Sequence, residues 1–219
     1  MSLFVVDLDD TLIDRKAAFA AWASSFVDQH RLPQGSLEWL LENDFGRGTV
    51  TVNGFFNWVT SRYGLPFSRD ELLAKFLEEF VSYFPPLTVE TREALTRLRA
   101  RGWKIAIVSN GSTSLQRRKL EVTGVIPLVD AWCVSEEAGV RKPEPAIFEL
   151  AAERCASNLI GGWMVGDSPE ADIAGGQAAG LHTAWIRRGR VWPEADPMPD
   201  LLVDTFAEAA TLVLQRQCQ

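Results

Sequence analysis

The sequence predicts an α/β fold, with a doubly wound parallel sheet and a small all-helical domain. Short apolar runs that end in turn-prone polar residues recur along the chain, and such runs are typical of buried parallel strands. From residue 87 onward they alternate with helical patterns, which implies right-handed crossovers within one sheet. The stretch before residue 87 has helical periodicity and no convincing strand. We therefore expect a Rossmann-like core domain of residues 1–14 and 86–219 and an inserted helical domain of residues 15–85.

The composition is that of an ordinary globular protein. The 219 residues suffice for one core plus a smaller lobe, and a net charge of −7 without a basic stripe argues against nucleic acid as a partner. The apolar run that opens the chain is too short for a membrane span or a signal peptide. Cys133, Cys155 and Cys218 form no C-x-x-C pair, which favours free thiols in a reducing compartment. We therefore expect a cytoplasmic location and no membrane partner.

The first expected strand begins at residue 3 and runs into three carboxylates and a threonine, namely Asp7, Asp9, Asp10 and Thr11. Asp7 and Asp9 are two positions apart, so an extended backbone presents both on the same side. Asp10 follows Asp9 directly and should point elsewhere. In a parallel sheet, reactive groups gather just past the carboxyl ends of the strands. The alternative is that these polar residues only begin a turn and cap a helix.

The inserted domain reads as a series of amphipathic helices. Residues 17–30 carry large apolar side chains on one helical face, and residues 52–63 form a second such run. A capping box at residues 68–71 opens a helix that we expect to continue through Phe84. Pro85-Pro86 then ends the helical domain. Most of its many aromatic side chains are expected to pack in the core of this domain.

Beyond the helical domain, strands and helices alternate. Gly102 is expected to stop the first of these helices, and Pro143 or Pro145 suits the first turn of a later one. The glycine-rich residues 175–180 lack the Lys-Ser/Thr of a P-loop, and we interpret them as close helix packing that ends in a C-cap. The expected strands are 103–108, 131–134, 162–165, 183–186 and 201–203, and the expected helices are 88–101, 114–123, one ending at 154, one ending at 179 and one beginning at 206.

Polar residues suited to phosphate chemistry recur near the ends of these strands. Because the carboxyl ends of parallel strands meet at one edge of the sheet, we expect their side chains to lie close together. The set combines acids, hydroxyl and amide donors and one cation, which are the groups needed to handle phosphate around a hard metal ion. Its members are Asp7, Asp9, Ser109, Asn110, Lys142 and Asp167.

The acidic residues at this edge predict a bound cation. They are Asp7, Asp9, Asp167 and Asp172. Two carboxylates about 4 Å apart repel each other by roughly 4 kcal/mol at an effective dielectric constant near 20. Gathering four such groups without a cation would be costly and would keep a phosphate dianion away. A magnesium ion together with Lys142 relieves both problems, and ligation by oxygen alone favours Mg²⁺ over zinc.

These residues resemble the four motifs of the haloacid dehalogenase superfamily, in the branch with a helical cap inserted after the first strand. Residues 7–11 match D-x-D-x-T, and Ser109-Asn110 after an apolar strand matches the second motif. Lys142-Pro143 is similar to the third motif, and residues 166–172 are similar to the fourth. The four motifs occur in order and at the places that the strand pattern demands.

The resemblance implies the chemical roles. Asp7 would be the nucleophile that forms an aspartyl-phosphate, and Asp9 would protonate the leaving oxygen and then take a proton from the hydrolytic water. The backbone carbonyl of Asp9 would hold Mg²⁺ together with the carboxylates of Asp7 and Asp167. Lys142 would neutralise the charge that gathers on nucleophile and phosphate.

The other motif residues would bind phosphate or support the site. Thr11 would orient the loop beside the phosphate, and Ser109 and Asn110 would hydrogen-bond the phosphoryl oxygens. Asp172, in the same motif as Gly166, would support the site by orienting the lysine of the third motif or a metal-bound water. The alternative is that Asp172 only caps the next helix.

The resemblance favours a phosphatase that acts on a small phosphomonoester. It implies that dehalogenases lack an aspartate at the position of Asp9, because they expel a halide and need no leaving-group acid. A sugar phosphomutase would use the same residues and stays open as an alternative. The helical insert and Asp9 both disfavour a non-catalytic phospho-acceptor that resembles a receiver domain. Monomer and homodimer both stay open.

In this branch the cap closes over the site and contacts the substrate. The loop of residues 44–48 is the best candidate, because its glycines allow close approach and Arg47 can meet a second anionic group; the alternative is a solvated turn. Residues 187–190 hold three arginines that could also bind phosphate, although we favour a solvated loop. His30 and His182 are expected to be structural or on the surface.

Overall fold

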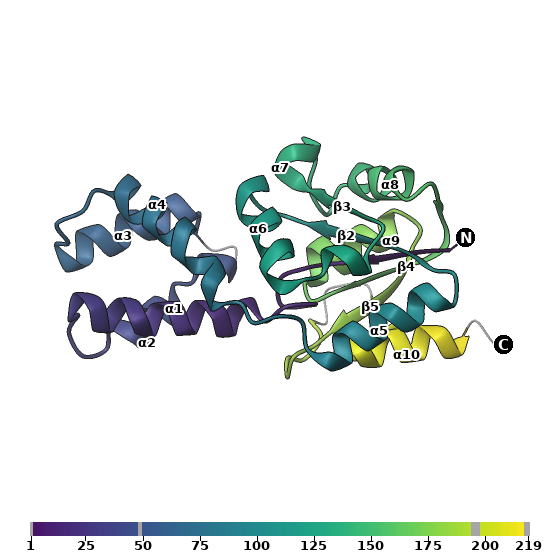
Figure 1. Cartoon of the computed structure of the whole chain (residues 1–219), viewed down its shortest axis with the longest axis horizontal. Helices are drawn as coiled ribbons and strands as arrows, with labels where there is room; N and C mark the ends of the chain where they lie inside the picture. The colour runs from purple at the N-terminus through teal and green to yellow at the C-terminus, as the bar shows by residue number, and fades with distance from the viewer. Residues whose placement is uncertain (1, 48–49, 194–197, 217–219) are drawn as a thin grey trace. The chain divides into compact units, whose positions relative to one another are not determined.

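The computed structural model describes residues 2–47, 50–193 and 198–216, and the chain divides into two compact units (Figure 1). One unit combines Met1–Asp14 with Pro86–Gln219, and the other is Arg15–Pro85. Gly48 of the expected substrate loop and Cys218 lie outside the described residues. None of the described helices is long and apolar enough to cross a membrane.

The larger unit is built on one six-stranded sheet in which every neighbouring pair of strands is parallel. The strand order is β3-β2-β1-β4-β5-β6, so the chain winds outward from β1 to one edge and then to the other. The prediction of a doubly wound parallel sheet is therefore confirmed. The order reverses between β1 and β4, which is where ligands bind in such sheets. The strands are β1 (Ser2–Val6), β2 (Lys104–Ser109), β3 (Ala131–Val134), β4 (Asn158–Gly166), β5 (His182–Ile186) and β6 (Leu201–Val203).

Helices cover both faces of this sheet (Figure 1). α5 and α10 contact each other and pack on one face, whereas α8 and α9 pack on the other. The helices of the larger unit are α5 (Val89–Ala100), α6 (Thr113–Thr123), α7 (Ser135–Ala138), α8 (Pro145–Arg154), α9 (Gly175–Ala178) and α10 (Phe206–Arg216), with a 3-10 turn at Ile126–Leu128 and a π-helical turn at Pro169–Ala174.

Alternate residues of β1 face these two helical layers. Leu3 and Val5 belong to a buried apolar cluster to which α8 contributes Phe148. Phe4 points the other way, and its ring meets that of Phe206 in α10 edge to face at a centroid distance of 6.1 Å. Because both faces are covered, the buried positions of β1 need apolar residues on both sides, and this is why Leu3 to Val6 form an unbroken apolar run in the sequence.

Two elements of this unit differ from expectation. β4 begins at Asn158, earlier than the expected residue 162, because Gly161-Gly162 interrupts the apolar pattern between Leu159-Ile160 and Trp163. The helix expected to end at 179 is a π-helical turn followed by the short α9. A Cβ on Gly175 would lie 2.8 Å from the Cα of Pro143, so the glycines do serve close packing, as the sequence indicated.

Every element in the described part of the second unit is a helix. Ser68 caps α4 in the expected capping box with Glu71, but α4 ends at Glu79 and a 3-10 turn replaces the last expected helical residues. The ring of Trp22 lies 4.8 Å from that of Phe76, within a core that is mostly aromatic. The elements are α1 (Arg15–His30), α2 (Ser36–Glu42), a 3-10 turn at Phe45–Arg47, α3 (Val52–Tyr63), α4 (Arg69–Glu79) and a 3-10 turn at Phe80–Tyr83.

Candidate active site

The loop after β1 turns sharply and places Asp7 at the carboxyl edge of the sheet. The backbone N–H of Asp7 donates to the carbonyl of Val165 at 2.9 Å, which extends the pairing with β4. The N–H groups of Leu12 and Ile13 both donate to the carbonyl of Leu8, at 3.0 and 3.1 Å, so the chain folds back at once. Asp7 is buried, with 6% of its surface exposed. A carboxylate is thus held in a place where water reaches it poorly.

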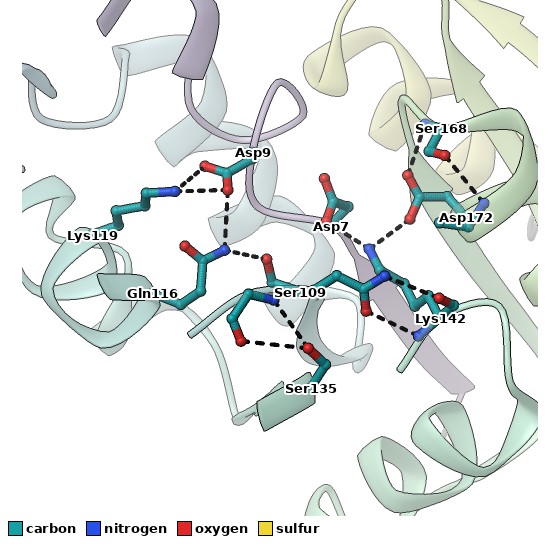
Figure 2. A network of polar contacts seen from close by, with 12 residues as sticks. Asp7, Asp9, Ser109, Gln116, Lys119, Ser135, Lys142, Ser168 and Asp172 are labelled. Carbon is teal, nitrogen blue, oxygen red and sulfur yellow. Dashed lines mark hydrogen bonds and ion pairs between the residues drawn. The ribbon is translucent and has the colours of Figure 1, made fainter. Parts of the chain in front are cut away.

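Lys142 binds two carboxylates from different parts of the chain (Figure 2). Its ammonium group donates to Oδ1 of Asp7 and to Oδ1 of Asp172, both at 2.6 Å. Burial alone would lower the pKa of Lys142, but the two carboxylates outweigh burial and raise it, so the lysine is charged. The sequence analysis expected Lys142, from a loop before a helix, to lie near the acids at the strand ends, and the structure brings it to within hydrogen-bond distance of the expected nucleophile.

The electrostatics of Asp7 reflect the same crowding. Burial raises the pKa of Asp7 well above its usual range, Lys142 lowers it, and the carboxylates of Asp172 and Asp167 raise it again. One carboxylate oxygen each from Asp7, Asp167 and Asp172 lie within 4.8 Å of one another. Lys142 pairs with Asp7 and Asp172, and Arg190 pairs with Asp167, so three carboxylates still face only these two cations. This set of oxygen donors therefore fits a hard divalent cation.

Asp172 makes both of the contacts that the sequence left as alternatives. Oδ1 accepts from Lys142, and Oδ2 accepts from the backbone N–H of Ser168 at 2.9 Å, at the start of the π-helical turn (Figure 2). A Cβ on Gly166 would lie 2.2 Å from Oδ2, so this position must be glycine for the carboxylate to fold back. Both oxygens of Asp172 are therefore engaged within the protein.

Asn110 lies beside the loop that carries Lys142. Its side-chain amide donates to the carbonyl of Lys142, and its side-chain oxygen accepts the N–H of Lys142, both at 3.0 Å. This reciprocal pair fixes the backbone of the lysine. The amide keeps one further N–H for the phosphate contact that the sequence predicts, and that contact stays a prediction.

Asp9 and Ser109 lie on either side of Gln116, a residue that the sequence analysis missed. The Gln116 amide donates to Oγ of Ser109 at 2.5 Å and to Oδ2 of Asp9 at 3.1 Å (Figure 2). The ammonium group of Lys119, also missed, contacts both oxygens of Asp9 at 2.8 and 2.7 Å. Gln116 and Lys119 occupy buried positions of α6 together with Leu120. Polar residues on the inward face of a helix were the available signal.

Arginines of the loop after β5 contact the site loops as well. Arg190 donates to the backbone carbonyl of Asp167 at 2.7 Å and to its Oδ2 at 3.0 Å. Arg188 donates to the carbonyl of Asp10 at 3.1 Å and pairs with Asp14 at 2.7 Å. The expectation of a solvated loop was therefore wrong for these two arginines. The cause is that β5 ends beside β4 and delivers the loop to the same edge of the sheet.

Thr11 and Arg47 have fewer described contacts. Oγ1 of Thr11 is buried and has no hydrogen-bond partner among the described residues. Arg47 ends a 3-10 turn in the second unit, and its side chain lies outside the described part of the structure. In the same loop, the carboxylate of Asp44 forms a buried bidentate ion pair with the guanidinium of Arg15, at 2.6 and 2.7 Å. A Cβ on Gly46 would lie 2.1 Å from the Arg15 guanidinium, so this glycine makes room for the arginine.

The fold and the site define a class of enzyme, in which the first strand of a Rossmann-like sheet ends in a buried aspartate that faces a lysine and further carboxylates. Residues 1–180 match the model of the haloacid dehalogenase-like hydrolases. The chain belongs to this family.

Several relatives with curated names are phosphatases. The chain is 34% identical to a phosphoserine phosphatase of Thermus thermophilus over 147 residues, which are 66% of this chain and 57% of that protein. It is 39% identical to the pyrimidine 5'-nucleotidase YjjG of Escherichia coli over 118 residues, 51% of each chain. These alignments span little more than half the length of either relative. The magnesium-bound structure of the HAD-hydrolase YfnB of Bacillus subtilis matches with a TM-score of 0.78 at 25% identity, over 97% of this chain and 98% of that one.

Proposed function

We propose that the protein is a Mg²⁺-dependent phosphatase that hydrolyses a small phosphomonoester through an aspartyl-phosphate on Asp7. The observation that carries the proposal is the contact between Asp7 and Lys142. Lys142 occupies Oδ1 of Asp7, and Oδ2 accepts no hydrogen bond from the described residues. A buried carboxylate with one oxygen anchored and the other available is suited to act as a nucleophile.

In the first step, Oδ2 of Asp7 would attack phosphorus while the bond from phosphorus to the ester oxygen breaks. Asp9 in its protonated form would give the departing oxygen its proton. Lys142 would balance the charge that collects on the transferred group, and Ser109 would donate to a phosphoryl oxygen. Anchoring Asp7 before the reaction saves the cost of ordering it during the reaction.

In the second step, water would attack the aspartyl-phosphate and release inorganic phosphate. Asp9 would take the proton from this water. The contacts of Asp9 with Lys119 and Gln116 suit its ionised form, which is the form that acts as the base. One carboxylate then serves both steps and returns to its starting state.

Asp7 and Asp167 would hold Mg²⁺ with their carboxylates, and Asp9 with its backbone carbonyl. The ion would supply charge that draws the phosphate to an otherwise acidic edge of the sheet. The oxygen-only donor set supports this choice of metal, as does the magnesium-bound relative YfnB. The phosphatase names of the relatives support the reaction class.

The test is phosphate release from a panel of phosphomonoesters, with and without Mg²⁺, for the wild type and Asp7→Asn. We expect wild-type turnover that requires Mg²⁺ and a loss of at least about 10³-fold in kcat for Asp7→Asn, because the amide cannot form the acyl phosphate. Turnover that survives in Asp7→Asn would refute the assignment of the nucleophile. Absence of release from every ester would favour a phosphomutase.

We further propose that Arg15–Pro85 acts as the cap and that Arg47 meets a second anionic group of the substrate. The magnesium-bound form of YfnB reveals interdomain movement in that protein, which supports a mobile cap in this family. Arg47→Ala should raise KM by about tenfold for esters with a second negative charge and leave singly substituted alkyl phosphates unchanged. Unchanged kinetics across the whole panel would remove the role of Arg47.

A further inference from the structure

Gln116 lies at the centre of a buried chain of hydrogen bonds beside the proposed phosphate site. Its side-chain nitrogen contacts both Asp9 and Ser109, and only 1% of the residue is exposed. A Cβ on Gly111 would lie 3.1 Å from the Gln116 side chain, so the glycine leaves just enough room for the amide. The amide is therefore held in place by packing as well as by hydrogen bonds.

The orientation of this amide follows from its neighbours. Lys119 donates to both oxygens of Asp9, and an ionised carboxylate can only accept hydrogen bonds. Gln116 must therefore turn its NH₂ group, and not its oxygen, toward Asp9. The second hydrogen of the same NH₂ group then points to Oγ of Ser109 at 2.5 Å.

This orientation decides what the Ser109 hydroxyl can do. Its oxygen accepts from Gln116, so its own hydrogen is left to donate. Ser109 is 2% exposed, and its O–H has no acceptor among the residues that the structure describes. A buried donor without an acceptor is costly, and a phosphoryl oxygen is a strong acceptor.

We propose that Gln116 is a positioning residue that makes Ser109 a donor to the phosphoryl group. Lys119 donates to Asp9, Gln116 donates to Asp9 and Ser109, and Ser109 donates to the ligand. A Ser109 hydroxyl that donated to a neighbouring side chain would instead present a lone pair and repel phosphate. This inference rests on the proposed function, because it assumes a phosphate beside Ser109.

The test measures the affinity for inorganic phosphate, as a competitive inhibitor of p-nitrophenyl phosphate hydrolysis with saturating Mg²⁺. Gln116→Met removes the amide at similar size, and we expect it to raise the inhibition constant about tenfold. Gln116→Glu keeps the shape but replaces the donor with an acceptor, so the Ser109 hydroxyl turns to the new carboxylate and phosphate binding weakens at least as far. This second variant also serves if Gln116→Met does not fold.

A double-mutant cycle separates positioning from a general loss of structure. In a Ser109→Ala background, Gln116→Met should change the inhibition constant less than about twofold, because no hydroxyl remains to be oriented. The matched control is Gln177→Met, since Gln177 donates to the carbonyl of Met198 elsewhere in this unit. The control should keep wild-type phosphate affinity.

The outcomes distinguish this inference from the proposed function. The positioning role would be overturned if Gln116→Met lost the same phosphate affinity with and without Ser109, or if both Gln116 variants kept wild-type affinity. The phosphatase assignment would still stand in either case, provided that the wild type turns over and Asp7→Asn is inactive. A wild type that neither hydrolyses p-nitrophenyl phosphate nor binds inorganic phosphate would overturn both.

Discussion

At the scale of single residues, the geometry of the site depends on a few contacts that hold Lys142 in place. Its ammonium group is shared between Asp7 and Asp172, its backbone is fixed by Asn110, and Asp172 is in turn held by Ser168. Each of these contacts orients the next. A disturbance several bonds away from Asp7 should therefore reach the chemistry.

Gly166→Ala is the substitution that tests this dependence. The new Cβ would lie 2.2 Å from Oδ2 of Asp172, so the carboxylate must move and the hold on Lys142 must loosen. We expect a loss of about 1–3 kcal/mol in the free energy of unfolding and at least about tenfold in kcat. Urea denaturation and steady-state kinetics measure the two. Asp172→Asn should reproduce the kinetic loss without the overpacking. Normal kinetics in Gly166→Ala would show that Asp172 tolerates displacement.

The sequence identified candidate site residues that belong to one short motif, such as Asp7 and Asp9. For Gln116 and Lys119 the signal was weaker, namely two polar residues on the inward face of a helix, because their role exists only when α6 packs beside the loop after β1. Arg190 was missed for a similar reason, since its contact with Asp167 joins two strand ends through the sheet. Contacts between distant segments need the fold before they can be assigned.

At the scale of secondary-structure elements, ion pairs fix the ends of strands and helices. Asp130, just before β3, accepts from Lys104 of β2 at 2.8 Å and from the N–H of Ile105 at 3.0 Å. Burial would raise the pKa of Asp130, but these hydrogen bonds outweigh burial and hold it below the usual value. The stabilisation is therefore complete above the pKa of the unfolded state and is lost as the pH falls through the lower pKa of the folded state.

Asp130→Asn should lower the free energy of unfolding by about 1–3 kcal/mol at neutral pH. The difference from the wild type should shrink as the pH falls through the lowered pKa of Asp130 in the folded state, because the wild-type carboxyl then becomes protonated as well. Urea titrations across this pH range measure the gap. If the difference in free energy of unfolding between the two proteins stays constant with pH, the shape of the side chain, and not its charge, explains the loss of stability.

In the helical unit, the pair of Arg15 and Asp44 joins α1 to the loop before the 3-10 turn. Both side chains are almost fully buried, with 7% and 6% exposed. Asp44→Asn removes the negative charge that Asp44 presents to the buried guanidinium and should cost about 3 kcal/mol of stability. Asp204→Asn, which breaks the exposed pair with Arg187, is the control and should cost less than about 1 kcal/mol. Equal losses in the two variants would contradict the importance of burial.

The sequence predicted the existence and type of most elements, because apolar periodicity and caps are local signals. Its errors lie where tertiary packing takes over. α4 stops at Glu79 although the apolar pattern continues, and the π-helical turn before α9 arises where Pro169 and Asp172 meet the site. At the start of β4, two glycines separate Leu159 and Ile160 from the rest of the strand, so the apolar pattern is broken there.

At the scale of the whole molecule, the sequence reveals the division into two compact units but not the substrate. The switch from helical periodicity to alternating strands and helices is visible in the sequence, and so is the parallel order of the sheet once right-handed crossovers are assumed. The substrate is not visible, because its choice depends on side chains that no short motif contains.

Magnesium should stabilise the entire larger unit. Asp7 and Asp167 repel each other in the folded state only, so an ion that binds them there raises the free energy of unfolding. At a concentration about 100 times Kd, the gain should be about 2.7 kcal/mol. Thermal melts with and without Mg²⁺ measure it, and Asp167→Asn should lose most of the increase. An equal increase in wild type and variant would place the ion elsewhere.

The strand order also bears on how the protein avoids aggregation. The two edges of the sheet are β3 and β6, which are only four and three residues long. An edge strand exposes unpaired N–H and C=O groups that can recruit a strand from another molecule, and short edges offer little such template. The buried apolar strand β1 and the nine-residue strand β4 lie at the centre, where both of their backbone edges are already paired. The strand order that assembles the site thereby also prevents its most apolar strands from pairing with another molecule.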